Sequence, residues 1–143
     1  MLFIYFLSKL FFGFFFLAGR NVYGRITIFH RGGGLRRRLR LVDYLRNIGS
    51  FGVLVDIFKC RYNTAYLGLV CYFSGFFSLV VVCCGMFVGS RVYSGYFVDP
   101  AMRFNPFVCG SSVPLRSVSL GHIVCLVELI IGGGAQVLRA AGL

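Results

Sequence analysis

Acidic residues are scarce in this chain of 143 residues, which holds 4 Asp and Glu against 15 Lys and Arg and so carries a net charge of +11. Tryptophan is absent, and charged residues make up only 13% of the chain, against about 25% in a typical soluble domain. This balance excludes most small soluble enzymes and favours a negatively charged partner, such as nucleic acid or a membrane surface. Because the four acids are scattered, we expect no paired-carboxylate site and no enzyme.

Residues that bind metals or form disulfide frameworks are also few. The chain has 2 His and 6 Cys, with no Cys-x-x-Cys pair, and adjacent Cys83 and Cys84 are poorly spaced to ligate one zinc ion. We therefore expect reduced, buried thiols, no metal site and no cofactor. Asp43 and Glu128 are expected to form ion pairs with nearby arginines.

Apolar residues fill the space that charged residues leave, at 58% of the chain, and this share excludes intrinsic disorder. The abundant Phe, Leu, Val, Gly and Cys can all be encoded by codons whose first two letters are T or G. The scarce Lys, Thr and Gln need A or C early in the codon. This bias indicates an organellar gene, and it means that hydropathy overstates the membrane character of the chain.

Two long apolar stretches leave the fold class open on composition alone. Residues 1–18 contain Lys9 as their only charge, and they fit a short membrane helix or an apolar extension lying on a partner. Residues 62–90 carry no charge and are also long enough to cross a membrane. Glycines and β-branched runs interrupt this second stretch, and Ser74-Gly75 is typical of a hairpin turn between strands at 67–73 and 76–82.

Arginine is concentrated between residues 20 and 46, where Asp43 is the only acid. Two stretches there, 25–30 and 38–44, alternate between polar and apolar residues on either side of three consecutive glycines. The alternation predicts two half-buried strands joined by a turn at the glycines, with a row of guanidinium groups on one face. A further strand is predicted over 122–131, after a loop-like stretch at 99–114.

Five ordered blocks between residues 18 and 143 carry a resemblance to a known family. The first two blocks are Gly19-Arg20-Asn21-x-x-Gly24-Arg25-Ile26-Thr27-x-x-His30-x-Gly32-Gly33-Gly34 and Arg40-x-x-Asp43-Tyr44-x-Arg46. The others are Leu69-Val70-x-Tyr72-x-x-Gly75, Pro114-x-Arg116-x-Val118-x-x-Gly121 and Gly132-Gly133-Gly134-x-Gln136-x-x-Arg139-x-Ala141-Gly142. Together they resemble the core of bacterial-type large-subunit ribosomal protein L2. The chain departs from that family at Leu35, where the family has His, and at Lys59 and Arg61, where it has acids.

The resemblance implies an all-β chain with an OB-fold barrel followed by the first strands of an SH3-like barrel. Its expected parts are an apolar extension at 1–18, an OB-fold RNA-binding domain at 19–110 and the start of an incomplete SH3-like barrel at 111–143. Small Greek-key barrels of the OB type bind oligonucleotides on one face and in loops.

The implied function is that of a structural constituent of the large subunit of an organellar ribosome, located in the mitochondrial matrix. The chain would bind large-subunit rRNA and support assembly near the peptidyl-transferase region, beside neighbouring ribosomal proteins. Because the family continues beyond the position of Leu143, a second chain carrying the missing C-terminal half is also expected. Membrane contact of residues 1–17 is left open.

The expected RNA contacts combine arginines, whose planar guanidinium groups bind phosphate in a bidentate manner, with glycines that allow close backbone approach. The main set is Arg20, Asn21, Arg25, Thr27, His30, Arg31, Gly32, Gly33, Gly34, Arg36, Arg37, Arg38, Arg40 and Arg46. A second set is Arg116, Gln136 and Arg139.

The alternative interpretation is a small polytopic membrane protein, with helices near 2–18 and 64–88 and a basic loop between them. Register distinguishes the two interpretations, because a membrane helix has no need of an Arg-Ile-Thr block or of glycines at fixed hairpin positions.

Overall fold

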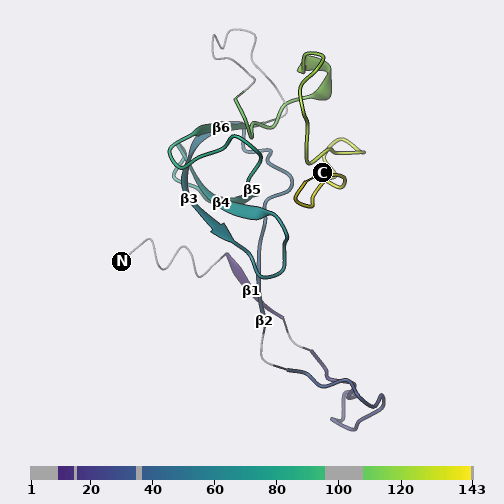
Figure 1. The fold of residues 1–143 in the computed structure, drawn as a ribbon. Coiled ribbons are helices and arrows are strands. Elements are labelled where there is room, and N and C mark those ends of the chain that lie inside the picture. The colour runs from purple at the N-terminus through teal and green to yellow at the C-terminus, as the bar shows by residue number, and fades with distance from the viewer. Residues whose placement is uncertain (1–9, 15, 35–36, 96–107, 143) are drawn as a thin grey trace. The chain divides into compact units, whose positions relative to one another are not determined.

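The computed structural model describes residues 10–14, 16–34, 37–95 and 108–142, and the chain divides into two compact units, residues 1–41 and residues 42–143. The regular elements of the described residues are strands and one short 3-10 turn (Figure 1). The predicted all-β class is therefore confirmed. The division into an OB-fold barrel and the start of an SH3-like barrel stays a prediction, and most of the apolar extension lies outside the described residues.

Unit 1, residues 1–41, is built on a two-stranded antiparallel ladder. Strand β1 (Phe11–Phe14) pairs with β2 (Arg37–Arg40), and Phe11 lies opposite Arg40. Strand β1 falls within the apolar stretch that was predicted as an extension or a membrane helix. The ladder closes the connection formed by residues 15–36, which contains four arginines.

The strand predicted at 25–30 is absent. Within the described residues its one ladder contact is an isolated bridge between Arg20 and Ile26, and Ile26 and Ile28 are each 54% exposed rather than buried. The prediction was wrong because this segment folds back onto Gly19. Of the strand predicted at 38–44, only the part up to Arg40 is a strand. It belongs to β2, which pairs with β1.

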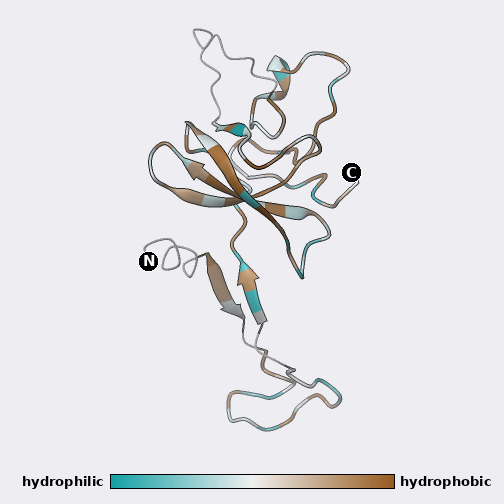
Figure 2. Cartoon of the chain, turned by 60° about the vertical axis from the view of Figure 1, so that its left-hand side comes forward, coloured by the Kyte–Doolittle hydropathy of each residue, from teal (hydrophilic) through white to brown (hydrophobic). Residues whose placement is uncertain are grey.

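Unit 2, residues 42–143, is organised around a four-stranded antiparallel sheet with the order β5-β4-β3-β6 (Figure 1). Isolated parallel bridges extend it, from Val42 to β5 at one edge and from Ser112 to β6 at the other. Hydrophobic residues concentrate along the strands of this sheet (Figure 2). The strands are β3 (Ser50–Lys59), β4 (Tyr66–Tyr72), β5 (Phe77–Val81) and β6 (Arg91–Ser94).

The hairpin of β4 and β5 confirms the two strands predicted at 67–73 and 76–82. Its turn is closed by hydrogen bonds from the Tyr72 N–H to the Phe76 carbonyl at 2.8 Å and from the Gly75 N–H to the Tyr72 carbonyl at 2.9 Å. Gly75 has a φ of +83°, which glycine adopts at little cost. The hairpin occupies the place of the helix near 64–88 that the membrane interpretation needs. Among the residues that the structure describes, no helix has the length and apolar character to cross a bilayer.

Two strands of the sheet, β3 and β6, have no counterpart in the sequence predictions, and a second predicted strand is wrong. Strand β3 is the longest, and a bulge between Leu54 and Asp56 shifts its register against β4. The strand predicted over 122–131 is reduced to an isolated bridge between Val127 and Val137. Most of the loop predicted at 99–114 lies outside the described residues.

Two apolar clusters hold unit 2 together. The first consists of Leu54, Val70, Tyr72, Val80, Met86 and Val92, and the second of Cys60, Ala65, Leu67 and Val81. The expectation of buried thiols holds for Cys60, whereas Cys84 and Cys109 are exposed. The remaining three thiols lie between these extremes.

Candidate nucleic-acid interface

Basic charge is concentrated in unit 1. Residues 1–41 hold eight of the fifteen Lys and Arg residues and none of the four acids. The side chains of Arg20, Arg25, Arg31 and Arg38 are exposed. Since the unit contains no carboxylate, these guanidinium groups can neutralise a polyanion without breaking ion pairs inside it.

The carbonyl of Gly19 organises the loop that displays these arginines. It accepts hydrogen bonds from the Thr27 N–H at 2.8 Å, the Ile28 N–H at 3.1 Å and the Thr27 hydroxyl at 3.1 Å. Gly19 has a φ of +68°, and a Cβ there would lie 2.4 Å from the Ile28 carbonyl oxygen. Only glycine fits this position, because any side chain would push the two segments of the loop apart.

Asn21 closes a tight turn in the same loop. Its Oδ1 accepts the Arg25 N–H at 2.9 Å, and its own N–H donates to the Arg25 carbonyl at 2.9 Å. The Asn21 carbonyl accepts the Gly24 N–H at 2.9 Å. The polar groups of Asn21 and Thr27, both expected at the RNA, therefore shape the loop, while Arg20 and Arg25 extend from it into solvent.

Apolar and aromatic side chains are exposed beside these arginines. Val22 and Tyr23 lie between Arg20 and Arg25, and all four are exposed. Phe29 and His30 are exposed next to Arg31. Arginine next to exposed aromatic rings suits unpaired RNA, because guanidinium groups bind phosphate while rings stack on bases.

The three glycines at 32–34 differ in their surroundings. A Cβ on Gly33 would lie 3.1 Å from the Ala18 Cβ, whereas Gly32 and Gly34 face open space. The backbone at Gly32 and Gly34 is thus accessible to a ligand. Arg40 lies with its guanidinium carbon 5.6 Å from the centre of the Phe11 ring. Arg36, and the side chain of Arg37, lie outside the described residues.

Arg46, by contrast, is enclosed in unit 2, where it is 7% exposed. Its Nε and Nη2 donate to the Ser94 hydroxyl at 3.0 and 2.9 Å, and Nη2 also donates to the Tyr93 carbonyl at 3.0 Å. Nη1 donates to the Gly110 carbonyl. Ser94 in turn bonds the Tyr72 hydroxyl at 2.8 Å. The Arg46 guanidinium therefore hydrogen-bonds groups inside unit 2 and is not exposed to a ligand.

The two acids expected to pair with arginines receive backbone hydrogen bonds instead. Asp43 Oδ1 accepts the Leu45 and Arg46 N–H groups at 3.1 and 2.9 Å, and Glu128 Oε2 accepts the Gly132 N–H at 3.3 Å. Within the described residues neither carboxylate has an arginine partner, so the ion-pair prediction was wrong. The reason is local, because each acid lies next to a turn whose N–H groups need an acceptor.

All three residues of the second expected set are exposed, and Arg139 also makes contacts within unit 2. Arg116 is exposed on the short 3-10 turn η1 (Leu115–Ser117), and Gln136 is exposed near the end of the chain. Arg139 lies over the Tyr44 ring at 4.4 Å and donates from Nε to the Ala135 carbonyl at 2.7 Å. The Ala135 N–H donates to the Tyr44 carbonyl at 2.9 Å, so Arg139 helps to fix the last turns of the chain against Tyr44.

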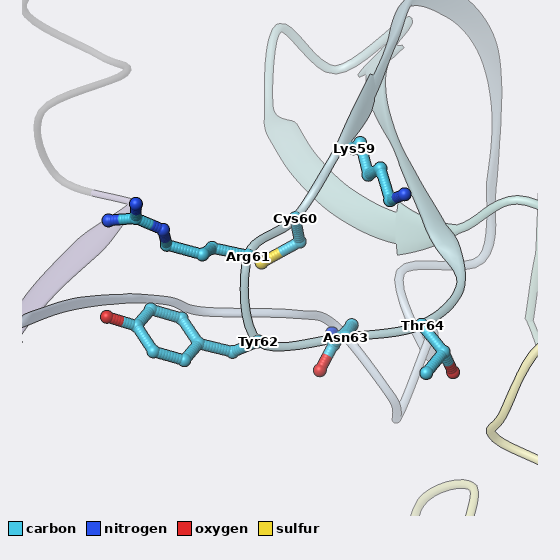
Figure 3. A pocket seen from close by; sticks show the side chains of 6 residues that line it. All are labelled: Lys59, Cys60, Arg61, Tyr62, Asn63 and Thr64. Atoms are coloured by element: carbon cyan, nitrogen blue, oxygen red, sulfur yellow. The ribbon is translucent and has the colours of Figure 1, made fainter.

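A second basic surface, which the sequence reasoning did not select, lies at the turn between β3 and β4. Residues 59–64 line a hollow of about 640 Å³ there (Figure 3). Lys59 and Arg61 both contribute to it. The sequence signal for this surface was the pair of cations Lys59 and Arg61. The sequence analysis noted them only as a departure from the family.

A pair of thiols joins the end of the sheet to the C-terminal part of unit 2. The sulfur atoms of Cys83 and Cys125 lie 2.9 Å apart. Their hydrogen bond raises the pKa of Cys83, and burial adds to this effect. The same bond, helped by the charge of Arg46, lowers the pKa of Cys125 from 9.0 to about 7 against the opposing effect of burial.

Comparisons with known proteins agree with this picture. A family model described as "Ribosomal Proteins L2, RNA binding N-terminal domain" matches residues 15–94, which include the whole arginine-rich loop, residues 16–34. The chain is 36% identical over 128 residues to "Large ribosomal subunit protein uL2" of Methylibium petroleiphilum and of Albidiferax ferrireducens, and 35% identical to that of Variovorax paradoxus. Each match covers 87% of this chain and 43% of the relative.

Proposed function

Because this chain belongs to the ribosomal protein L2 family, we propose that it is an RNA-binding structural component of a large ribosomal subunit. The observation that supports this role best is the loop of residues 16–34, which exposes guanidinium and aromatic side chains in a unit without acids. Membership of a ribosomal protein family also agrees with the expectation that the chain is not an enzyme.

The proposed ligand is large-subunit rRNA near the peptidyl-transferase region. The buried Arg46 and the exposed Arg139, whose guanidinium groups bond other residues of unit 2, would act by ordering the chain. Asn21 and Thr27 would hold the loop in shape. The direct contacts proposed are Arg20, Arg25, His30, Arg31, Gly32, Gly33, Gly34, Arg36, Arg37, Arg38 and Arg40, with Arg116 and Gln136 as a second group.

The proposed architecture keeps an OB-fold domain at 19–110 and the start of an SH3-like barrel at 111–143. The four-stranded antiparallel sheet of β3 to β6 supports the first part, because an OB-fold is a small barrel of antiparallel strands. The isolated antiparallel bridge between Val127 and Val137 supports the second part, because it joins two segments within it.

The proposed location is the ribosome of the mitochondrial matrix. The bias of the chain toward residues with G- and T-rich codons supports an organellar gene. The relatives named above are bacterial, which fits an organelle of bacterial ancestry as well as a bacterium.

The proposed protein partners are neighbouring ribosomal proteins and a second chain with the remaining part of the family sequence. The relatives extend well beyond the region that this chain matches. Several large apolar side chains near the C-terminus are fully or almost fully exposed, among them Leu120, Ile123 and Ile131. If these side chains form one patch, a neighbouring protein would cover it, because large exposed apolar patches are rare on free monomers.

Sedimentation of a native organelle lysate, with the chain followed by mass spectrometry, tests the proposal. We expect the chain to migrate with the large ribosomal subunit and to leave those fractions after RNase treatment. The same fractions would contain a second polypeptide with the remaining family sequence.

A chain that stays in the membrane pellet until detergent releases it, and that RNase does not affect, would overturn the ribosomal role. Ribosomal fractions that lack any second polypeptide with the remaining sequence would overturn only the two-chain arrangement.

A further inference from the structure

The turn between β3 and β4 is a candidate ligand site in its own right. Strand β3 ends at Lys59 and β4 begins at Tyr66, and these two residues form the last pair of their ladder. The hollow of about 640 Å³ is lined by consecutive residues of this turn: Lys59, Cys60, Arg61, Tyr62, Asn63 and Thr64. The site therefore belongs to unit 2 and involves no residue of the arginine-rich loop.

Both ends of the turn are anchored. Cys60 and Ala65 are buried in one cluster with Leu67 and Val81. The Thr64 hydroxyl oxygen accepts the Ala141 N–H at 3.3 Å, which links the turn to the C-terminal part of the unit. An anchored turn loses little conformational freedom when a ligand binds, so more of the contact energy appears as affinity.

The cations of the turn are available to a ligand. Lys59 and Arg61 are exposed, and within the described residues neither makes an ion pair or a hydrogen bond through its side chain. No acid occurs between residues 59 and 64. The nearest acid along the chain, Asp56, accepts the Ile57 N–H at 2.8 Å. The turn is therefore a concentrated positive charge without internal neutralisation.

An exposed aromatic ring accompanies the cations. Tyr62 is 43% exposed. Figure 3 shows the Arg61 and Tyr62 side chains extending toward the same side of the turn, while Lys59 extends to the other side. A guanidinium for phosphate next to a ring for stacking is the pair of groups that binds one unpaired nucleotide. Asn63 and Thr64 add neutral groups able to hydrogen-bond a base or a sugar.

We propose that the β3–β4 turn is a second RNA site, which binds an unpaired nucleotide through Arg61 on its phosphate and Tyr62 on its base, while Lys59 on the other side of the turn binds a neighbouring phosphate. This inference rests on the proposed function, because it takes the ligand to be RNA. It adds an anchoring point on unit 2 to the contacts of the arginine-rich loop.

The test measures binding of the full chain to a fluorescently labelled single-stranded oligouridylate of about ten nucleotides, within the length that one OB-fold covers. The double variant Lys59→Ala/Arg61→Ala should bind about ten-fold more weakly and reduce the slope of log K against log salt by roughly one to two. Tyr62→Leu should weaken binding about five-fold, whereas Tyr62→Phe, which keeps the ring, should bind like the wild type.

Two controls separate this site from the rest of the chain. Arg91→Ala removes an exposed cation from β6 and should leave affinity unchanged. Arg20→Ala/Arg25→Ala removes two cations from the arginine-rich loop and should weaken binding whether or not the turn is a site. Circular dichroism of each variant checks that the sheet is intact.

The outcomes distinguish this inference from the proposed function. A wild-type chain that fails to bind any RNA would overturn both. If the loop variant weakens RNA binding and the turn variants do not, the second site alone is overturned. This holds even if the turn variants lose affinity for polyglutamate, which serves as a probe for an acidic protein partner. Ultraviolet crosslinking offers an independent readout, and a nucleotide attached to Tyr62 would support the site.

Discussion

At the scale of single residues, some residues of the arginine-rich loop fix its conformation and others are exposed for contact with RNA. Gly19, Asn21 and Thr27 use their polar groups or their backbone freedom to close the loop, and Arg20 and Arg25 remain exposed. Sequence reasoning placed Arg20, Asn21, Arg25 and Thr27 at the RNA, because a motif does not reveal which polar groups are already satisfied. Hydrogen-bond partners in the folded chain make that distinction.

Replacement of Gly19 by Ala should open the loop. The added Cβ would lie 2.4 Å from the Ile28 carbonyl oxygen, and the left-handed backbone adds strain of about 1–3 kcal/mol. We expect trypsin to cleave after Arg20 and Arg25 roughly ten-fold faster. Gly24→Ala is the matched control, because Gly24 also has a positive φ but nothing within 4 Å of an added Cβ. Equal cleavage rates in the two variants would contradict the close approach at Gly19.

Replacement of Arg46 by Met should destabilise unit 2. The variant leaves the Tyr93 and Gly110 carbonyls without the guanidinium donors, so the free energy of unfolding should fall by about 2–4 kcal/mol. Denaturant titration followed by tyrosine fluorescence measures this change. Arg91→Met, at an exposed position, should change the free energy by less than about 0.5 kcal/mol. Similar losses in both variants would mean that Arg46 is not a buried structural residue.

The thiol pair should ionise once near neutral pH. Because the pKa of Cys125 is lowered to about 7, one thiolate should form as the pH rises from 6 to 8, while Cys83 keeps its proton. The ultraviolet absorbance of the thiolate in the folded chain measures this step. Cys125→Ser should remove it, and Cys84→Ser should not, because Cys84 is exposed and lies outside the pair. A first thiolate that forms only near pH 9 in the wild type would contradict the Cys83–Cys125 hydrogen bond.

At the scale of elements, β3 contains neighbouring residues with opposite surroundings. Leu54 is fully buried in the first apolar cluster, and Val55, at the bulge, is 39% exposed. Leu54→Ala should lower the free energy of unfolding by about 2–5 kcal/mol through lost contacts and a cavity. Val55→Ala should cost less than about 1 kcal/mol. Chemical denaturation of the two variants tests the register, and a larger loss for Val55 would place the wrong residue in the core.

The elements that could be predicted from the sequence are those whose signal is local. The β4–β5 hairpin has aromatic and β-branched residues on both sides of Ser74-Gly75, so propensity and turn chemistry agree. Strand β3 escaped prediction because Gly52 and Asp56 interrupt its apolar pattern, and because the bulge breaks strict alternation. Residues 25–30 have the alternation of a strand without a partner strand, and alternation cannot reveal a missing partner.

The candidate site was predictable in part for the same reason. The exposed arginines of residues 20–38 follow from a basic stretch without acids, which sequence alone displays. The burial of Arg46 depends on Ser94 and Gly110, which lie 48 and 64 residues away along the chain. The thiol pair likewise joins residues 42 apart. Contacts at such separations leave no periodic signal in the sequence.

At the scale of the whole molecule, RNA binding should depend strongly on salt. If six to ten of the proposed contacts neutralise phosphates, log K against log salt should have a slope of about −4 to −9. Fluorescence anisotropy of the chain with a labelled rRNA fragment, repeated at several salt concentrations, measures the slope. A neutral crowding agent at equal osmolarity serves as the control and should leave the affinity unchanged. A slope near zero would mean that phosphate contacts do not drive binding.

The bonds of Arg46 to Tyr93, Ser94 and Gly110 have a consequence for how unit 2 unfolds. These bonds hold together the residues that flank the segment from 95 to 109. The Ser112 N–H adds a hydrogen bond of 2.9 Å to the Tyr93 carbonyl. One guanidinium group thus joins the edge strand β6 to the backbone at Gly110, so these two parts of unit 2 should unfold together rather than one after the other.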